Sequence, residues 1–241
     1  MSRTNVLGVE FDNVTMQEAV ERALELISAR SCAYCATPNP EIVMLAKEDA
    51  ALREALAGAD MVLPDGAGIV KGAAILGRPM KQKVPGIDFA CGVMAQLAER
   101  GGSVYLFGAK PGVAEAAGQT LKGMFPGLVI SGTSDGYFSD DGPIIEKISA
   151  AAPDMLLVCL GAPKQELWMA KMAGKLPLGL MVGLGGSLDV FAGVVERAPK
   201  FWCDHGLEWF YRLLKEPRRI GRMMKLPLFL VHVKQEKGKR R

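Results

Sequence analysis

Cysteine, histidine and aromatic residues are scarce in this chain of 241 residues. The five cysteines are an odd number in apolar surroundings, which favours reduced thiols in the cytoplasm over a disulfide framework. Cys32 and Cys35 form a C-x-x-C, but a zinc site needs a second pair of ligands, and only His205 and His232 remain. Aromatic side chains make up 7% of the chain, which argues against an aromatic-rich β-sandwich.

Long apolar runs are also missing. No run reaches the roughly 18 residues of a membrane-spanning helix, and the first residues contain no apolar segment typical of a signal peptide. The chain is 49% hydrophobic and 23% charged, a composition that supports a folded core. We therefore expect a globular, cytoplasmic protein.

Two signatures of catalysis or cofactor binding are absent. The chain has no Asp-x-Asp pair of the kind that holds a metal–nucleotide complex, and no full dinucleotide fingerprint. The missing fingerprint disfavours an NAD-dependent dehydrogenase. We expect no metal and no cofactor.

Positive charge is concentrated near the C-terminus. Residues 196–241 carry thirteen Lys or Arg against five Asp or Glu, whereas residues 1–195 carry sixteen against twenty-one. We place a domain boundary here, between an α/β body (1–195) and a basic appendage (196–241). Such a segment suits nucleic acid, a membrane surface or a phosphorylated substrate, or is simply solvated, and charge alone does not choose.

Hydrophobic periodicity predicts alternating helices and strands. The predicted helices include 16–29, capped by Thr15, and 41–57 and 88–100; the predicted strands are 31–36, 59–63, 103–107, 128–132, 155–160 and 178–182. Continuous apolar strands between helices predict a mostly parallel, Rossmann-like sheet covered on both faces. Ligands of such sheets bind beyond the carboxyl ends of the strands, where this chain is rich in glycine, proline and polar residues.

Three polar residues follow the first two predicted sheet strands. Asp65 stands at a strand end, and Gly66 beside it allows a ligand to approach the backbone. A carboxylate there is either a general base or the N-cap of the next helix, and spacing alone favours the cap. Thr37 and Asn39 present the same two interpretations, capping or ligand binding.

Two later segments suit phosphate binding. Gly108 opens a turn whose N–H groups face the start of a helix, although the turn lacks the Walker pattern. Lys164 offers charge, Gln165 offers hydrogen bonds, and Glu166 is an acid or an ion-pair partner. The alternative is an ordinary helix start, in which Glu166 lies in the first turn, where the helix dipole favours it.

The segment 206–233 mixes cations with large apolar side chains. Trp209 and its neighbours beside arginines suit the headgroup region of an anionic membrane, and we expect Leu226 and Phe229 to contact it. Nucleic acid is the rival partner, but basic residues interleaved with Leu, Met and Phe favour lipid. Exposed membrane-seeking surface also predicts self-association into a homo-oligomer.

Six motifs in a fixed order resemble one family. They are Thr37-Pro38-Asn39, Pro64-Asp65-Gly66, Val84-Pro85-Gly86-Ile87-Asp88, Gly161-Ala162-Pro163-Lys164-Gln165-Glu166-Leu167-Trp168, Arg197-Ala198-Pro199, and Gly206-Leu207-Glu208-Trp209 through Pro217-Arg218-Arg219. Over nearly its whole length, the chain is similar to the WecG/TagA/CpsF bacterial glycosyltransferases.

The resemblance implies an inverting, metal-independent transferase of bacterial surface polysaccharide synthesis. It would move N-acetylmannosamine, its uronic acid or a related hexose from a UDP-sugar to a polyprenyl-diphosphate-linked saccharide, at the cytoplasmic face of the membrane. The implied catalytic residues are Asp65, as base, with Thr37, Arg212, Arg219 and Arg222. The substrate-binding residues that we predict are Asn39, Gly66, Gly108, Lys164, Gln165, Glu166 and Asp189.

The chain departs from the family pattern at two places. The segment 183–189 replaces the commoner Gly-Ala-x-Phe-Asp type of segment, and Lys83 stands where an arginine is usual. Two alternatives from other classes remain: a membrane-docked protein that binds nucleotide-sugar without turnover, and an RNA-binding protein. The last would show steep salt dependence on RNA and no effect of UDP.

Overall fold

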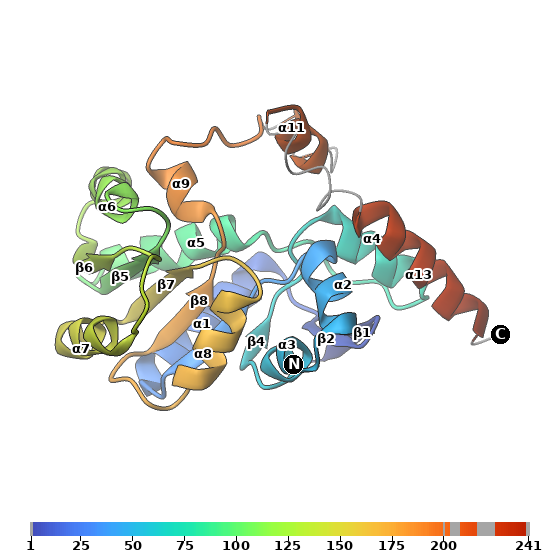
Figure 1. The fold of residues 1–241 in the computed structure, drawn as a ribbon, viewed down its shortest axis with the longest axis horizontal. Coiled ribbons are helices and arrows are strands. Elements are labelled where there is room, and N and C mark those ends of the chain that lie inside the picture. The colour runs from blue at the N-terminus through green and yellow to red at the C-terminus, as the bar shows by residue number, and fades with distance from the viewer. Residues whose placement is uncertain (1, 200, 203–207, 216–224, 240–241) are drawn as a thin grey trace.

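A computed structural model describes residues 2–199, 201–202, 208–215 and 225–239 (Figure 1). Its strands are β1 (Arg3–Val6), β2 (Val9–Asp12), β3 (Ala33–Ala36), β4 (Met61–Val62), β5 (Ser103–Gly108), β6 (Val129–Ser134), β7 (Met155–Cys159) and β8 (Leu180–Gly183). Its helices are α1 (Met16–Ala29), α2 (Pro40–Glu48), α3 (Ala50–Ala57), α4 (Ala67–Ile75), α5 (Gly86–Ala98), α6 (Val113–Met124), α7 (Gly142–Ala151), α8 (Lys164–Met172), α9 (Ser187–Phe191), α11 (Glu208–Lys215) and α13 (Lys225–Lys239).

The main sheet has six parallel strands in the order β4-β3-β8-β7-β5-β6, with helices on both faces (Figure 1). Successive residues of β7 show why this strand needs helices on both faces of the sheet. Leu156 and Val158 pack into one apolar cluster with Trp168 of α8, whereas Leu157 packs into the other with Phe89 of α5. The α/β prediction is confirmed.

Capping residues set two of the early helix boundaries. Thr15 begins α1 with a capping box, because its hydroxyl accepts from Glu18 N at 3.2 Å and its own N–H donates to Glu18 Oε2 at 2.7 Å. The predicted single helix 41–57 is wrong, since the chain leaves helical geometry at Asp49. The Asp49 carboxylate accepts from Leu52 N at 3.0 Å and so starts α3 as a second helix.

A short antiparallel hairpin precedes the main sheet and was not predicted. It consists of β1 and β2, and it buries Phe11. Asp12 joins it to the sheet, because one carboxylate oxygen accepts from Val62 N of β4 at 2.8 Å and the other pairs with Arg3 Nε at 3.0 Å. This hairpin lies beside the strand that leads to Asp65.

The last helix, α13, packs against α2 and α4 of the body. Phe229 and Val233 lie four residues apart, on one face of α13, and both are 0% exposed. A Cβ added at Gly72 of α4 would come within 2.9 Å of the Phe229 ring, so Gly72 leaves the space that the ring fills. The expectation that Phe229 contacts a membrane is therefore wrong. None of the described helices combines the length and apolarity needed to cross a bilayer.

Candidate active site

The carboxyl ends of the parallel strands bring most of the predicted residues to one edge of the sheet. Thr37 follows β3, Asp65 follows β4, Gly108 ends β5, and Lys164 opens α8 after β7. The loop 183–186, at the end of the central strand β8, separates the two halves of this edge. In Figure 1, α11 lies on the same upper side of the molecule as α9, which follows this loop.

Asp65 lies half-buried between β4 and α4. The N-cap residue of α4 is Gly66, whose φ of 92° belongs to the left-handed region that favours glycine. The N-cap position is thus held by a residue without a side chain, and the interpretation of Asp65 as N-cap is not what the structure has.

Thr37 and Asn39 were each expected either to cap a helix or to bind a ligand, and the structure treats the two residues differently. Asn39 is the N-cap of α2, and its Oδ1 accepts from Ile42 N at 3.1 Å. Its Nδ2 donates no hydrogen bond within the described ranges, so the amide can still donate to a ligand. Thr37 caps no helix: it is buried, and its hydroxyl donates to the carbonyl of Gly183 at 2.7 Å.

Gln165 and Glu166 are buried in the first turn of α8, at 2% and 1% exposed. Gln165 Oε1 accepts from Gly185 N at 2.9 Å, and its Nε2 donates to Glu166 Oε1 at 2.9 Å. Glu166 Oε2 has no hydrogen-bond partner among the described residues. Desolvation raises the pKa of the Glu166 carboxyl, which favours its neutral form.

Lys164 contacts the loop between β6 and α7. Its ammonium lies 3.8 Å from the ring centroid of Phe138 and donates to Gly136 O at 3.1 Å. Phe138 in turn packs against Phe107, with ring centroids 5.6 Å apart. This contact gives Lys164 a structural role, and phosphate binding by its remaining donors stays a prediction.

The positions of the remaining predicted site residues say less about substrate binding. Gly108 has φ 132°, and a Cβ there would collide with the Cys159 carbonyl, so close packing of β5 on β7 already requires glycine. Asp189 lies partly exposed in α9. Arg212 belongs to α11, but its side chain is outside the described residues, as are Arg219 and Arg222 entirely.

Two of the family motifs, the one at 197–199 and the one at 84–88, have a structural role that the sequence did not reveal. Arg197 pairs with both carboxylate oxygens of Asp88, at 2.7 and 2.8 Å, and so ties the segment before α11 to the start of α5. In the same motif, a Cβ at Gly86 would lie 3.0 Å from Thr37 Oγ1. In the sequence, the only signal for these contacts was that the residues belong to the family motifs. The motifs do not tell which of them lie in contact.

A cleft of about 310 Å³ opens at the opposite, amino edge of the sheet. Two of its charged groups already serve the fold, because Arg30 pairs with Asp154 at 3.1 Å and donates to two backbone carbonyls. Within the described ranges, no three His, Cys, Asp or Glu side chains gather as a metal site would require.

Comparisons with known proteins identify the family to which the chain belongs. The model of the glycosyl transferase WecG/TagA/CpsF family matches residues 4–241. A Bacillus spizizenii protein named N-acetylglucosaminyldiphosphoundecaprenol N-acetyl-beta-D-mannosaminyltransferase is 38% identical over 83% of this chain and 78% of its own length. A Staphylococcus aureus protein of the same name is 34% identical over 99% of this chain and 94% of its own. The chain therefore belongs to the WecG/TagA/CpsF family and is a glycosyltransferase.

Proposed function

We propose that this enzyme transfers N-acetylmannosamine, or a closely related hexose, from a UDP-sugar to an N-acetylglucosamine carried on a polyprenyl diphosphate. The observation that carries the proposal is the position of Asp65, Thr37 and Asn39 shortly after the neighbouring strands β3 and β4, at the carboxyl edge of a parallel sheet, in a chain whose relatives bear that transferase name.

A transfer assay with defined substrates tests this function. The full-length chain is incubated with UDP-N-acetylmannosamine and a synthetic lipid-diphosphate N-acetylglucosamine, and the lipid products are analysed by mass spectrometry. We expect one N-acetylhexosamine to be added, and UDP to be released in equal amount. Binding of the UDP-sugar without formation of this product, from either UDP-N-acetylmannosamine or a related UDP-hexose, would overturn the proposed reaction.

Asp65 supplies the base in this proposal. Its carboxylate takes the proton of the acceptor hydroxyl while the hydroxyl oxygen attacks the anomeric carbon of the donor sugar. The bond from that carbon to the UDP oxygen breaks on the opposite face, so the sugar configuration inverts and UDP leaves as an anion. Cations must stabilise that charge, and Arg212, Arg219 and Arg222 are our candidates.

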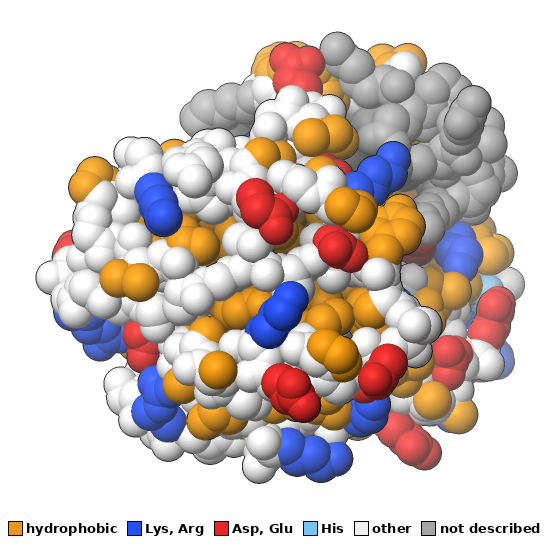
Figure 2. Space-filling model, turned by 60° about the vertical axis from the view of Figure 1, so that its left-hand side comes forward, with side chains coloured by type: hydrophobic (Ala, Val, Ile, Leu, Met, Phe, Trp, Pro, Cys, Tyr) orange, Lys and Arg blue, Asp and Glu red, His pale blue; other side chains and the backbone are white. Residues whose placement is uncertain are grey.

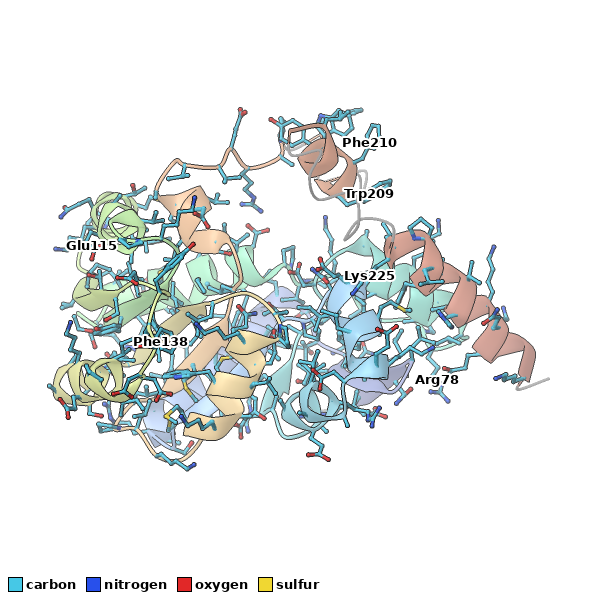
Figure 3. The ribbon with its side chains drawn as sticks, in the orientation of Figure 1. Arg78, Glu115, Phe138, Trp209, Phe210 and Lys225 are labelled. Carbon is cyan, nitrogen blue, oxygen red and sulfur yellow. The ribbon has the colours of Figure 1, made fainter. Side chains whose placement is uncertain are left out.

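The appendage also supplies the proposed contact with the membrane. On α13, Leu228 is 46% exposed and Val231 is 48% exposed, beside the exposed Lys234. On α11, the exposed Phe210 projects beside Trp209 (Figure 3). Apolar side chains next to cations suit an anionic lipid surface. The body face in Figure 2 instead intermingles acidic and basic side chains, which does not favour nucleic acid as partner.

Point changes should separate the two roles of the appendage. Replacing Arg212, Arg219 or Arg222 with alanine should lower kcat by about 10²–10³-fold on a short, soluble acceptor, because transition-state charge loses a partner. Leu228→Ser with Val231→Ser should instead weaken binding to anionic vesicles and spare turnover of that acceptor. If all three arginine variants keep normal turnover, the arginine role is wrong and the appendage only anchors.

Chelators should not affect the rate. Because arginines take the charge-stabilising role in our proposal, we expect full transfer in excess EDTA. A loss of activity that added Mg²⁺ or Mn²⁺ restores would overturn the metal-independent mechanism.

Self-association also stays a prediction, which the molar mass of the full-length protein in solution checks.

A further inference from the structure

Gln165 of α8 holds the loop 183–186 from one side, and Glu166 in turn bonds to Gln165. Gln165 Oε1 accepts the N–H of Gly185, and Gln165 Nε2 donates to Glu166 Oε1, both at 2.9 Å. Thr37 holds the other end of the loop, because its hydroxyl donates to Gly183 O at 2.7 Å. Gln165 of α8 and Thr37, which follows β3, therefore fix the loop at the peptide groups of Gly185 and Gly183.

The burial of this pair leaves little room for direct contact with substrate. Gln165 is 2% exposed and Glu166 is 1% exposed, and both already bond within the protein. The space beside them is also filled: a Cβ at Gly183 would lie 2.7 Å from Met169 Cε and 3.1 Å from Gln165 Nε2. Their effect must therefore pass through the loop.

Among the described residues, nothing covers the loop at its glycines. Gly185 has φ 52°, and a Cβ built there meets no atom of the described residues within 4 Å. At Gly186 the nearest of these atoms to such a Cβ is an Asp189 carboxylate oxygen, at 3.7 Å. A glycine loop at the carboxyl end of a central parallel strand allows a phosphate group to approach the backbone closely.

Glu166 decides which way the Gln165 amide points. If the amide turned over, its NH₂ group would face the Gly185 N–H, and two donors would oppose each other. Glu166 Oε1 accepts a hydrogen bond from Gln165 Nε2, and this bond forms only in the orientation in which Gln165 Oε1 faces Gly185. Because Glu166 Oε2 is buried and has no hydrogen-bond partner in the described part of the chain, this carboxyl is retained at a cost that a purely apolar core position would avoid.

We propose that Glu166 is a positioning residue: it locks the Gln165 amide, and the amide fixes the loop 183–186 in the shape that receives the diphosphate of the donor. The inference rests on the proposed function for the identity of that ligand, but not for the lock itself. A glutamine at position 166 offers the same acceptor, whereas a leucine of similar size offers none.

Hydrogen exchange and UDP binding test the lock and its use separately. In Glu166→Leu, we expect the amides of the loop 183–186 to exchange roughly 5-fold faster, as the loss of one hydrogen bond allows. We expect kcat/KM for the UDP-sugar to fall on the order of 10²-fold, as for a displaced binding group. KM for the acceptor should stay unchanged, and Glu166→Gln should restore both exchange and rate.

A double variant sharpens the test. If Glu166 acts only through Gln165, Glu166→Leu costs nothing further in a Gln165→Met background. Should Glu166→Leu not fold, Gln165→Met alone must release the loop in the same way. Unchanged exchange of the loop in a folded Glu166→Leu, or additive losses in the double variant, would overturn the lock. Absence of UDP binding by the wild-type protein would instead overturn the proposed function.

Discussion

Asp65→Asn should lower kcat by about 10²–10⁴-fold, the usual cost of losing a general base. The substitution keeps the size of the side chain and removes only its ability to take a proton. Because the N-cap residue of α4 is Gly66, we expect α4 and the fold to survive the change. Thermal unfolding and UDP affinity should therefore match the wild-type protein, while transfer to the lipid-linked acceptor is lost.

A matched change elsewhere serves as the control for this result. Glu54→Gln removes a carboxylate from the exposed side of α3, away from the carboxyl edge of the sheet, and should leave the rate unchanged. Activity of Asp65→Asn within a few-fold of wild type, in a folded protein that binds UDP, would remove Asp65 from the mechanism.

Phe229→Ala should lower the free energy of unfolding by about 3–5 kcal/mol, the cost of emptying a buried aromatic site. The ring is 0% exposed and rests against Gly72 of α4, so its removal leaves a cavity between α13 and the body. Chemical denaturation of the full-length chain measures this change. This result would show that α13 stabilises the fold.

Leu228→Ala is the control on the same helix. Leu228 is 46% exposed, so its truncation should change the free energy of unfolding by less than about 0.5 kcal/mol. Equal effects of the two substitutions would contradict the orientation of α13. Transfer by the Phe229 variant under stabilising conditions would show how far α13 also supports α2 and α4, which follow Asn39 and Asp65 directly.

The fold was predictable where local signals and the final structure agree. Continuous apolar strands require cover on both faces, and the alternation of Leu156 and Leu157 between two clusters meets that requirement. The break at Asp49 was missed because the apolar spacing continues across it, and the carboxylate cap outweighs that pattern. The burial of Phe229 was missed because it depends on space at Gly72, more than 150 residues earlier.

The candidate site divides in the same way. The rule that ligands bind beyond strand ends, together with the family motifs, placed Asp65, Thr37 and Asn39 at one edge. The partners of these residues were not readable, because Thr37 meets Gly183 across 146 residues. Gln165 likewise bonds to a backbone amide 20 residues away, and its contact with substrate stays a prediction. Such pairings follow from the strand order, which periodicity does not specify.

The anomeric configuration of the product tests the central claim most directly. The full-length enzyme is given UDP-N-acetylmannosamine and a lipid-diphosphate N-acetylglucosamine, and the new glycosidic linkage is assigned by NMR. We expect a single transferred N-acetylmannosamine whose configuration is inverted relative to the donor, formed by the wild-type chain and not by Asp65→Asn. A product with retained configuration would contradict single displacement with Asp65 as base.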